Sequence, residues 1–258
     1  MIAVPAATPV RTASLEDPLI PRSARLTVPL LALALALAAV VAGCAGATAT
    51  PPPPSQAPDL QPCPPTGGTC VGPLVPGDHV SRSFVPQFAY DVPSGWRNDT
   101  DLPGNYYLRP VGFDVGGIYF FRDMAIASQD PTCPRIAATG IGTSAKEIVD
   151  WIAAAPGLQA SRPESVDLGG LDAWRVEVAL AADWTFACPF ADGIPSHPLF
   201  VAESGIYWAM ADTEQLQLTI ADLPEGGTVA VDIDAFFGAD YQALRQAADP
   251  IVRSIEFR

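Results

Sequence analysis

The five cysteines are the residues of this 258-residue chain whose chemistry is easiest to specify. A thiol can form a disulfide, ligate a metal ion or carry a lipid, and its surroundings decide which of these it does. The five are Cys44, Cys63, Cys70, Cys133 and Cys188. Because five is an odd number, intramolecular disulfides would leave one thiol over, and one cysteine is expected to have a separate role.

Cys44 is the candidate for that role because it follows an apolar segment. Arg22 and Arg25 precede an apolar run from Leu26 to Val41, and small residues lead from there into Cys44. A positive flank, a short apolar core and a small-residue exit are the parts of a secretory signal. The run is shorter than the roughly 20 apolar residues that a membrane-spanning helix needs. Residues 1–43 are therefore predicted to be a signal peptide.

The end of this segment, Val41-Ala42-Gly43-Cys44, resembles the lipobox of bacterial lipoproteins. In that family the cysteine sulfur carries a diacylglyceryl group, and the chain is cut just before the cysteine. The resemblance implies that Cys44 is lipidated and anchors the protein to the outer face of the cytoplasmic membrane. The alternative is an uncleaved signal anchor in which Cys44 is merely apolar.

A proline-rich segment follows the candidate anchor. Residues 44–80 include four consecutive prolines, Pro51 to Pro54, and further prolines up to Pro65. Such a segment favours extended polyproline II structure and a low content of packed elements. We predict a disordered tether over residues 44–80; the alternative is a ligand for an aromatic groove on another protein.

The four other cysteines form an even set in an exported chain, which predicts disulfides. We favour Cys63–Cys70, which closes a short turn-rich loop, and Cys133–Cys188, which joins two loops of the globular region. The other pairings remain open.

The two histidines offer the competing chemistry. His79 or His197 could ligate zinc with the thiols, or His197 could activate Cys188 as a nucleophile. No Cys-x-x-Cys pair occurs and neither histidine has a standard ligand spacing, so no metal or other cofactor is predicted. Both histidines lie among prolines or glycines, which is typical of surface turns.

A polar segment after Trp96 is the first candidate for binding a small ligand. It contains Asp99 and Asp101 and is followed by Tyr106 and Tyr107. Carboxylates in a loop could bind calcium, and a loop with aromatic residues at its base could hold an organic ligand. The alternative is a core tryptophan beneath a surface turn.

Asp232 and Asp234 form a second acidic pair. They lack the glycine and the distal glutamate of an EF-hand loop. Alternation with Val231 and Ile233 places them on the polar side of a predicted strand, and we expect a solvated face.

No motif for catalysis or for nucleic-acid binding is present in the sequence. Gly-x-Ser-x-Gly, Ser-x-x-Lys, His-Glu-x-x-His and phosphate-loop patterns are all missing, so no catalytic residue is predicted. The chain has 14 Lys+Arg against 28 Asp+Glu, a net charge of −14, and no basic stripe to neutralise phosphates.

Its apolar content of 49% is enough for a core of normal size.

The pattern of residues 81–258 predicts one α+β domain with an antiparallel β-sheet flanked by helices. Period-two alternation predicts strands, with a hairpin at Gly169-Gly170 and another at residues 224–227. Ser144 and Glu147 match a capping box at the start of a helix. A second helix is expected near residues 241–251, with Pro250 kinking or restarting it.

Several segments together resemble known proteins. They are Phe84-Val85-Pro86, Phe88-Ala89-Tyr90-Asp91-Val92-Pro93-Ser94-Gly95-Trp96, Cys133-Pro134, the helix with Trp151, the Gly169-Gly170 hairpin and the ending Ile251-Val252-Arg253-Ser254-Ile255-Glu256-Phe257. This set is similar to uncharacterised extracytoplasmic lipoproteins of GC-rich bacteria and, more loosely, to the PsbP/Mog1/LpqN-like group. The resemblance implies an antiparallel sheet flanked by helices and roles in binding and assembly, and it transfers no catalytic residue.

These observations predict a non-enzymatic, membrane-anchored binding or assembly module of the cell envelope, whose partner is an envelope protein or a small ligand. One alternative is an exported hydrolase with a site built from distant residues, including His197. The other is a small solute-binding receptor, although about 178 residues is short for two lobes and a cleft.

Overall fold

The structure is a computed structural model that describes residues 71–258, apart from residues 204, 212, 237 and 238. The predicted signal peptide, Cys44 and the predicted Cys63–Cys70 disulfide lie outside the described residues. The described part is an α+β domain that is mostly antiparallel sheet with two helices, as predicted. Residues 72–80, which the sequence assigned to the tether, include two short strands, β1 and β2.

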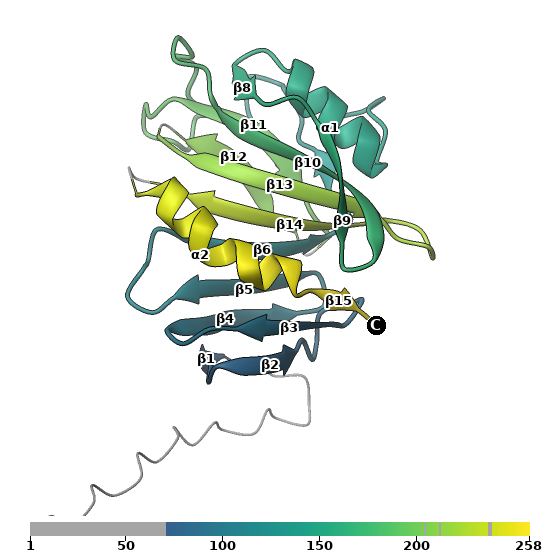
Figure 1. Ribbon diagram of the computed structural model, residues 1–258. Helices are drawn as coiled ribbons and strands as arrows, with labels where there is room; N and C mark the ends of the chain where they lie inside the picture. Colours follow the sequence, from purple (N-terminus) through teal and green to yellow (C-terminus); the bar gives the residue numbers. More distant parts are fainter. Residues whose placement is uncertain (1–70, 204, 212, 237–238) are drawn as a thin grey trace, which may run out of the picture. The chain divides into compact units, whose positions relative to one another are not determined.

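The main sheet has nine strands, all paired antiparallel, in the order β1-β4-β5-β6-β14-β13-β10-β8, with β9 also pairing with β10 (Figure 1). In that order the strands are Gly72–Pro73, Trp96–Leu102, Asn105–Pro110, Gly116–Arg122, Thr228–Ala235, Gln215–Asp222, Leu171–Leu180 and Leu158–Ala160, and β9 is Glu164–Leu168.

Two three-stranded sheets and two helices complete the described elements. One small sheet has the order β15-β3-β2, with bounds Glu256–Phe257, Phe88–Val92 and Gly77–Val80. The other has the order β12-β11-β7, with bounds Tyr207–Ala211, Ser196–Val201 and Ala125–Ile126. The helices are α1 (Ala145–Ala154) and α2 (Tyr241–Arg253). Neither helix is long and apolar enough to cross a bilayer.

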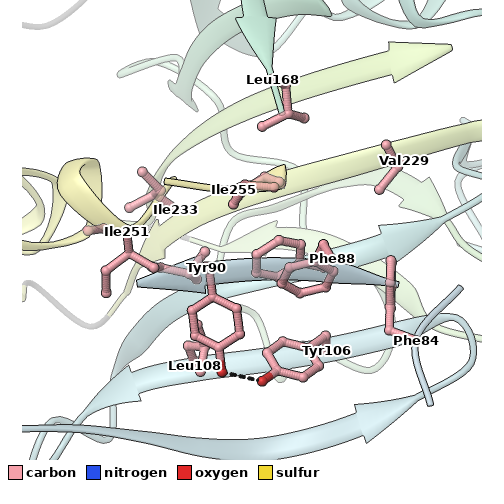
Figure 2. Close-up of a cluster of buried hydrophobic side chains, with 14 of the residues drawn as sticks. Phe84, Phe88, Tyr90, Tyr106, Leu108, Leu168, Val229, Ile233, Ile251 and Ile255 are labelled. Carbon is pink, nitrogen blue, oxygen red and sulfur yellow. Dashed lines mark hydrogen bonds between the residues drawn. The ribbon is translucent and has the colours of Figure 1, made fainter. Parts of the chain in front are cut away.

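The main sheet separates two hydrophobic cores, because successive side chains of a strand point to opposite faces. Val229 and Ile233 of β14 pack in the first core with Phe88 and Tyr90 of β3 and with Ile251 of α2 (Figure 2). On the opposite face, the second core joins β6, β10, β13 and β14 to α1 and to the β12-β11-β7 sheet.

Strand β13 is buried on both faces. Its polar residues Gln217 and Thr219 are buried as well as its apolar ones. Gln217 donates a hydrogen bond to Glu177 (3.3 Å), so part of its polar side chain is satisfied inside the protein. The sheet is central, and it has no open polar side at this strand.

Local signals in the sequence were accurate where they govern backbone hydrogen bonds. Ser144 and Glu147 form the predicted capping box at the start of α1. Gly169 and Gly170 connect β9 to β10 with positive φ of 60° and 85°, which glycine adopts without steric cost. Helix α2 continues through Pro250 to Arg253, so of the two predicted effects of that proline, a kink or a restart, the restart does not occur.

A disulfide joins Cys133 to Cys188, as predicted, across a separation of 55 residues. It links the loop between β7 and α1 (residues 127–144) to the loop between β10 and β11 (residues 181–195). We call these two segments the clamped loops.

Candidate functional site

The predicted ligand loop after Trp96 is a strand, β4, paired with β5. Trp96 and Tyr106 are buried in the first core, where the Tyr106 hydroxyl lies 2.5 Å from the hydroxyl of Tyr90 (Figure 2). Burial raises the pKa of Tyr106, and the neighbouring Tyr90 raises it further. Trp96 and Tyr106 are therefore core residues. For Trp96 this agrees with the alternative interpretation, a core tryptophan beneath a surface turn.

Asp101 has a structural role in the same core region. Its carboxylate accepts hydrogen bonds from the backbone N–H groups of Arg82 (2.8 Å), Ser83 (2.9 Å) and Phe84 (3.0 Å). Three donors satisfy a buried carboxylate well. Asp101 therefore holds the segment before β3 in place.

Asp99 lies among arginines. It forms ion pairs with Arg97 (2.5 Å) and with Arg109, which also contacts Asp114. Burial acts to raise the pKa of Asp99, but hydrogen bonds from Arg109 and Arg97 outweigh it, and the pKa lies below its usual value. The carboxylate is ionised and already paired.

Tyr107 is the last of the five residues predicted to bind a ligand. It belongs to a group of aromatic side chains that the sequence did not indicate. Its ring stacks on Tyr119 of β6 at 4.1 Å between centroids. Trp208 of β12 packs against Tyr119 with an edge-to-face geometry at 5.1 Å. All three rings are half-buried, so they form an aromatic platform where the β12-β11-β7 sheet meets the main sheet. The structure thus separates Tyr107 from Trp96, Asp101 and Tyr106.

Asp232 and Asp234 contradict the expectation of a solvated strand face. Both side chains have an exposed fraction of 0%. None of their four carboxylate oxygens has a hydrogen-bond partner. Burial raises the pKa of each well above its usual value, and the negative charge of Glu214 raises both further. The error arose because period-two alternation cannot show that a second layer covers the polar face.

Glu214 connects these carboxyl groups to the aromatic platform. Its carboxylate accepts hydrogen bonds from Trp208 Nε1 (2.7 Å) and from the backbone N–H of Ala211 (2.6 Å). Burial raises the pKa of Glu214 to about 7, although these two hydrogen bonds act to lower it. We call Asp232, Asp234, Glu214, Tyr107, Tyr119 and Trp208 the acid–aromatic cluster. In the described part of the chain, no group of three or more His, Cys, Asp or Glu residues could hold a metal ion.

The histidines occupy strands, which corrects the prediction of surface turns. His79 of β2 has Nε2 2.7 Å from the carbonyl oxygen of Val75. His197 of β11 is buried, with its nitrogens 3.0 Å and 2.9 Å from the carbonyl oxygens of Pro156 and Pro198. Burial lowers the pKa of His197, although both carbonyls act to raise it. The favoured Cys133–Cys188 disulfide occupies the sulfur of Cys188, so the alternative, a Cys188 nucleophile activated by His197, is excluded.

The clamped loops form an exposed apolar surface over Tyr207. Arg135 places its guanidinium carbon 5.6 Å from the ring centroid of Phe190 and 5.8 Å from that of Tyr207. The Phe190 and Tyr207 rings pack edge to face at 5.8 Å. Ile136, Phe190 and Ile194 have exposed fractions of 60%, 46% and 47%. We call these five residues the clamped-loop surface.

A separate pocket of about 400 Å³ opens at the end of β6 and β14. It is lined by Asp123, Met124, Ala125, Thr143 and the Gly226-Gly227-Thr228 turn. Asp123 accepts a hydrogen bond from the backbone N–H of Thr228 (3.0 Å), so the carboxylate helps to fix the turn. Its position and partners indicate a structural role.

The fold thus defined is an antiparallel α+β domain with a disulfide-linked surface. No family model matches the sequence. No curated protein matches it either. Several solved structures resemble the fold at low identity, and three of them are described next.

A structure from Bacteroides thetaiotaomicron is 13% identical, with a TM-score of 0.31; the likeness covers 66% of this chain and 45% of that one. Our chain therefore spans less than half the length of that protein. Cyanobacterial PsbP from Synechocystis is 12% identical, with a TM-score of 0.36 and coverage of 74% and 98%. LpqN of Mycobacterium tuberculosis, described as involved in cell envelope biogenesis, is 14% identical, with a TM-score of 0.34 and coverage of 66% and 82%. PsbP-like and LpqN structures are thus among the structural neighbours of this fold.

Proposed function

We propose that the protein is an extracytoplasmic binding module, tethered to the outer face of the membrane by a lipid on Cys44, that binds a partner protein through the clamped-loop surface. The observation that carries the proposal is that two covalently linked loops expose Ile136, Phe190 and Ile194 and that Arg135 of one loop packs on Phe190 of the other. Exposed apolar residues grouped in this way mark interaction sites on soluble domains.

The composition of this surface supports the binding of a protein. Aromatic residues and arginine are the types that contribute most to protein–protein affinity, and they cluster in pairs at interface centres. Phe190, Tyr207 and Arg135 form such a group. The Cys133–Cys188 disulfide restrains both loops, which lowers the conformational entropy lost on binding.

Charge indicates the chemistry of the partner. Arg135 forms no ion pair with any residue of the described chain. It is an unpaired cation in a protein of net charge −14. A partner segment with a carboxylate beside an apolar side chain would pair with Arg135 and cover Phe190. A second copy of this acidic chain is disfavoured by like-charge repulsion.

Site-specific photo-crosslinking in intact cells tests this binding function. A photoreactive residue at position 190 is expected to give one discrete crosslinked partner, while the same residue at exposed Gln242 on α2 gives none. Arg135→Glu should remove the adduct at position 190, because it replaces the unpaired cation with an anion. Arg162→Glu, which makes the same charge change at another exposed arginine, should leave it intact.

The captured protein is then purified and titrated with the full chain. Arg135→Glu is expected to weaken binding by at least about tenfold, the usual effect of losing an interface charge pair. Equal adducts at positions 190 and 242, a self-adduct only, or equal affinity of the Arg135→Glu variant would contradict the proposed surface.

A further inference from the structure

The acid–aromatic cluster contains two buried carboxyl groups without partners, which the proposed binding function does not use. Asp232 and Asp234 are fully buried, and neither forms an ion pair with a described arginine, lysine or histidine. Their four oxygens have no hydrogen-bond donor. Buried carboxylates are almost always paired or hydrogen-bonded, because an unpaired one costs several kcal/mol (~3). A ligand that brings both positive charge and N–H donors would satisfy them.

The neighbours of the pair show where such a ligand would be held. Asp232 lies opposite Tyr119 in the β14–β6 register, and Asp234 lies opposite Gly117. The ring of Tyr107 covers Gly117, since a Cβ there would meet Tyr107 Cε2 at 2.6 Å. Paired residues of adjacent antiparallel strands have Cβ atoms about 5 Å apart, so these rings adjoin the carboxyl groups.

Aromatic rings are suitable walls for a cation. The faces of tyrosine and tryptophan attract ammonium groups within about 6 Å of the ring centroid. Tyr119 contacts both Tyr107 and Trp208, and all three side chains are half-buried, so their outer parts reach the surface while the carboxyl groups below do not. The Tyr107 hydroxyl donates a hydrogen bond to the carbonyl oxygen of Gly116 (3.0 Å) and Trp208 Nε1 donates one to Glu214 (2.7 Å), so a ligand that enters between these rings must break one of the two bonds.

We infer that Asp232 and Asp234 are a binding site for an aliphatic ammonium ligand, with a short diamine as the best match. Residues two apart on a strand are about 6.6 Å apart, so one ammonium group can face each carboxylate of a short diamine. In the described part of the chain, these acidic residues do not form a group with the arrangement of a metal site. A neutral sugar or alcohol brings no positive charge that could replace the protons of the two carboxyl groups.

Binding must displace protons from this site. Burial raises the pKa values of the Asp232 and Asp234 carboxyl groups, and it also raises the pKa of Glu214 beside them. The other titratable groups that interact with the pair are Tyr107 and Tyr119 on the platform and Tyr241 across the sheet. No cation is among these groups, so an ammonium ligand replaces protons, which pass to solvent, and affinity should rise with pH.

Isothermal titration of the full chain with putrescine at about pH 8 tests the site. We expect saturable binding, with proton release visible as a heat that depends on the ionisation enthalpy of the buffer. 1,4-Butanediol, which has the same chain without charge, should not bind, and n-butylamine should bind at least about tenfold more weakly than putrescine.

Variants separate this site from general attraction of amines to an acidic protein. The double variant Asp232→Asn with Asp234→Asn should weaken putrescine binding by at least about tenfold, whereas Asp172→Asn, at an exposed aspartate, should not change it. Tyr107→Leu, which keeps both carboxyl groups, should weaken binding about three- to tenfold and provides the decisive variant if the double variant does not fold. Equal binding of 1,4-butanediol, equal loss in Asp172→Asn, or no effect of the folded site variants would overturn the inference.

Discussion

At the scale of single residues, three aspartates show how surroundings set the state of a carboxyl group. Asp101 is buried and accepts three backbone hydrogen bonds. Asp99 is paired with two arginines, and its pKa is low. Asp232 is buried without any partner, and burial raises its pKa well above the usual value. Asp99 stabilises the fold when it is ionised, whereas Asp232 destabilises it when it is ionised.

The pH dependence of stability follows from this difference. A carboxyl group whose pKa is higher in the folded state contributes stability that is fully present below its unfolded pKa and is lost as pH rises through its folded pKa. For Glu214 that window runs from 4.5 to about 7. For Asp232 and Asp234 the loss begins near 3.8 and continues upward. The free energy of unfolding should therefore decrease with pH above about pH 4.

Replacing Asp232 with asparagine should flatten this decrease. An amide cannot ionise. Between about pH 4 and pH 8, the free energy of unfolding of the Asp232→Asn variant is therefore expected to decrease by about 1–3 kcal/mol less than that of the native chain. Urea denaturation followed by circular dichroism at each pH measures it. Asp172→Asn, at an exposed position, should keep the native slope. A native slope in both variants would show that Asp232 does not carry the effect.

Residue pattern could identify only part of the candidate sites. Tyr107 and Asp99 were selected because they are near Trp96 in sequence, yet Trp96 lies in the first core. Tyr119 and Trp208 are distant in sequence and meet Tyr107 only through strand pairing and the β12-β11-β7 layer. A single sequence contains no signal for such long-range contacts, so the acid–aromatic cluster could not have been predicted.

At the scale of elements, the disulfide determines how the clamped loops present their side chains. Cys133 and Cys188 are both buried and connect loops whose chain separation is 55 residues. In the chain-entropy model a cross-link of this length contributes about 4 kcal/mol by restricting the unfolded chain. The same bond keeps Arg135 close to Phe190.

Replacing both bridge cysteines should therefore affect stability and binding together. Cys133→Ser with Cys188→Ser is expected to lower the free energy of unfolding by about 2–4 kcal/mol. It should also weaken partner binding, because the loops lose their restraint before association. Denaturant titration and calorimetry with the captured partner measure the two effects. Unchanged affinity in a folded double variant would show that the bridge does not organise the surface.

Elements with local signals were predictable, and their packing was not. The Ser144 capping box and the Gly169-Gly170 hairpin were correct because each depends on a few adjacent residues. The β12-β11-β7 layer covers the second face of the main sheet and buries Asp232, and this arrangement depends on contacts far apart in the chain. The same limit explains why His197 was assigned to a surface turn.

At the scale of the whole molecule, the proposed anchor and the acidic charge act in opposition. A net charge of −14 repels the protein from an anionic membrane surface, so electrostatic adsorption cannot hold it there. Two acyl chains on one cysteine would hold it firmly, since each buried methylene contributes about 0.8 kcal/mol.

Loss of the lipidation site should release the protein. Cys44→Ser is expected to move the chain from the membrane fraction to the soluble extracytoplasmic fraction, as measured by fractionation and immunoblotting. Ser55→Ala, a neutral change in the predicted tether, should leave it with the membrane. A Cys44→Ser protein that stays in the membrane fraction would refute lipidation as the anchor.

The central claim is that the clamped loops carry the binding surface, and hydrogen–deuterium exchange of the full chain tests it most directly. The chain is measured alone and in complex with the partner captured at position 190. We predict slower exchange on binding in residues 131–137 and 189–194, with helix α2 and strands β4 and β5 unchanged. Protection confined to α2 or to β4 and β5, with the clamped loops exchanging as in the free chain, would contradict the account.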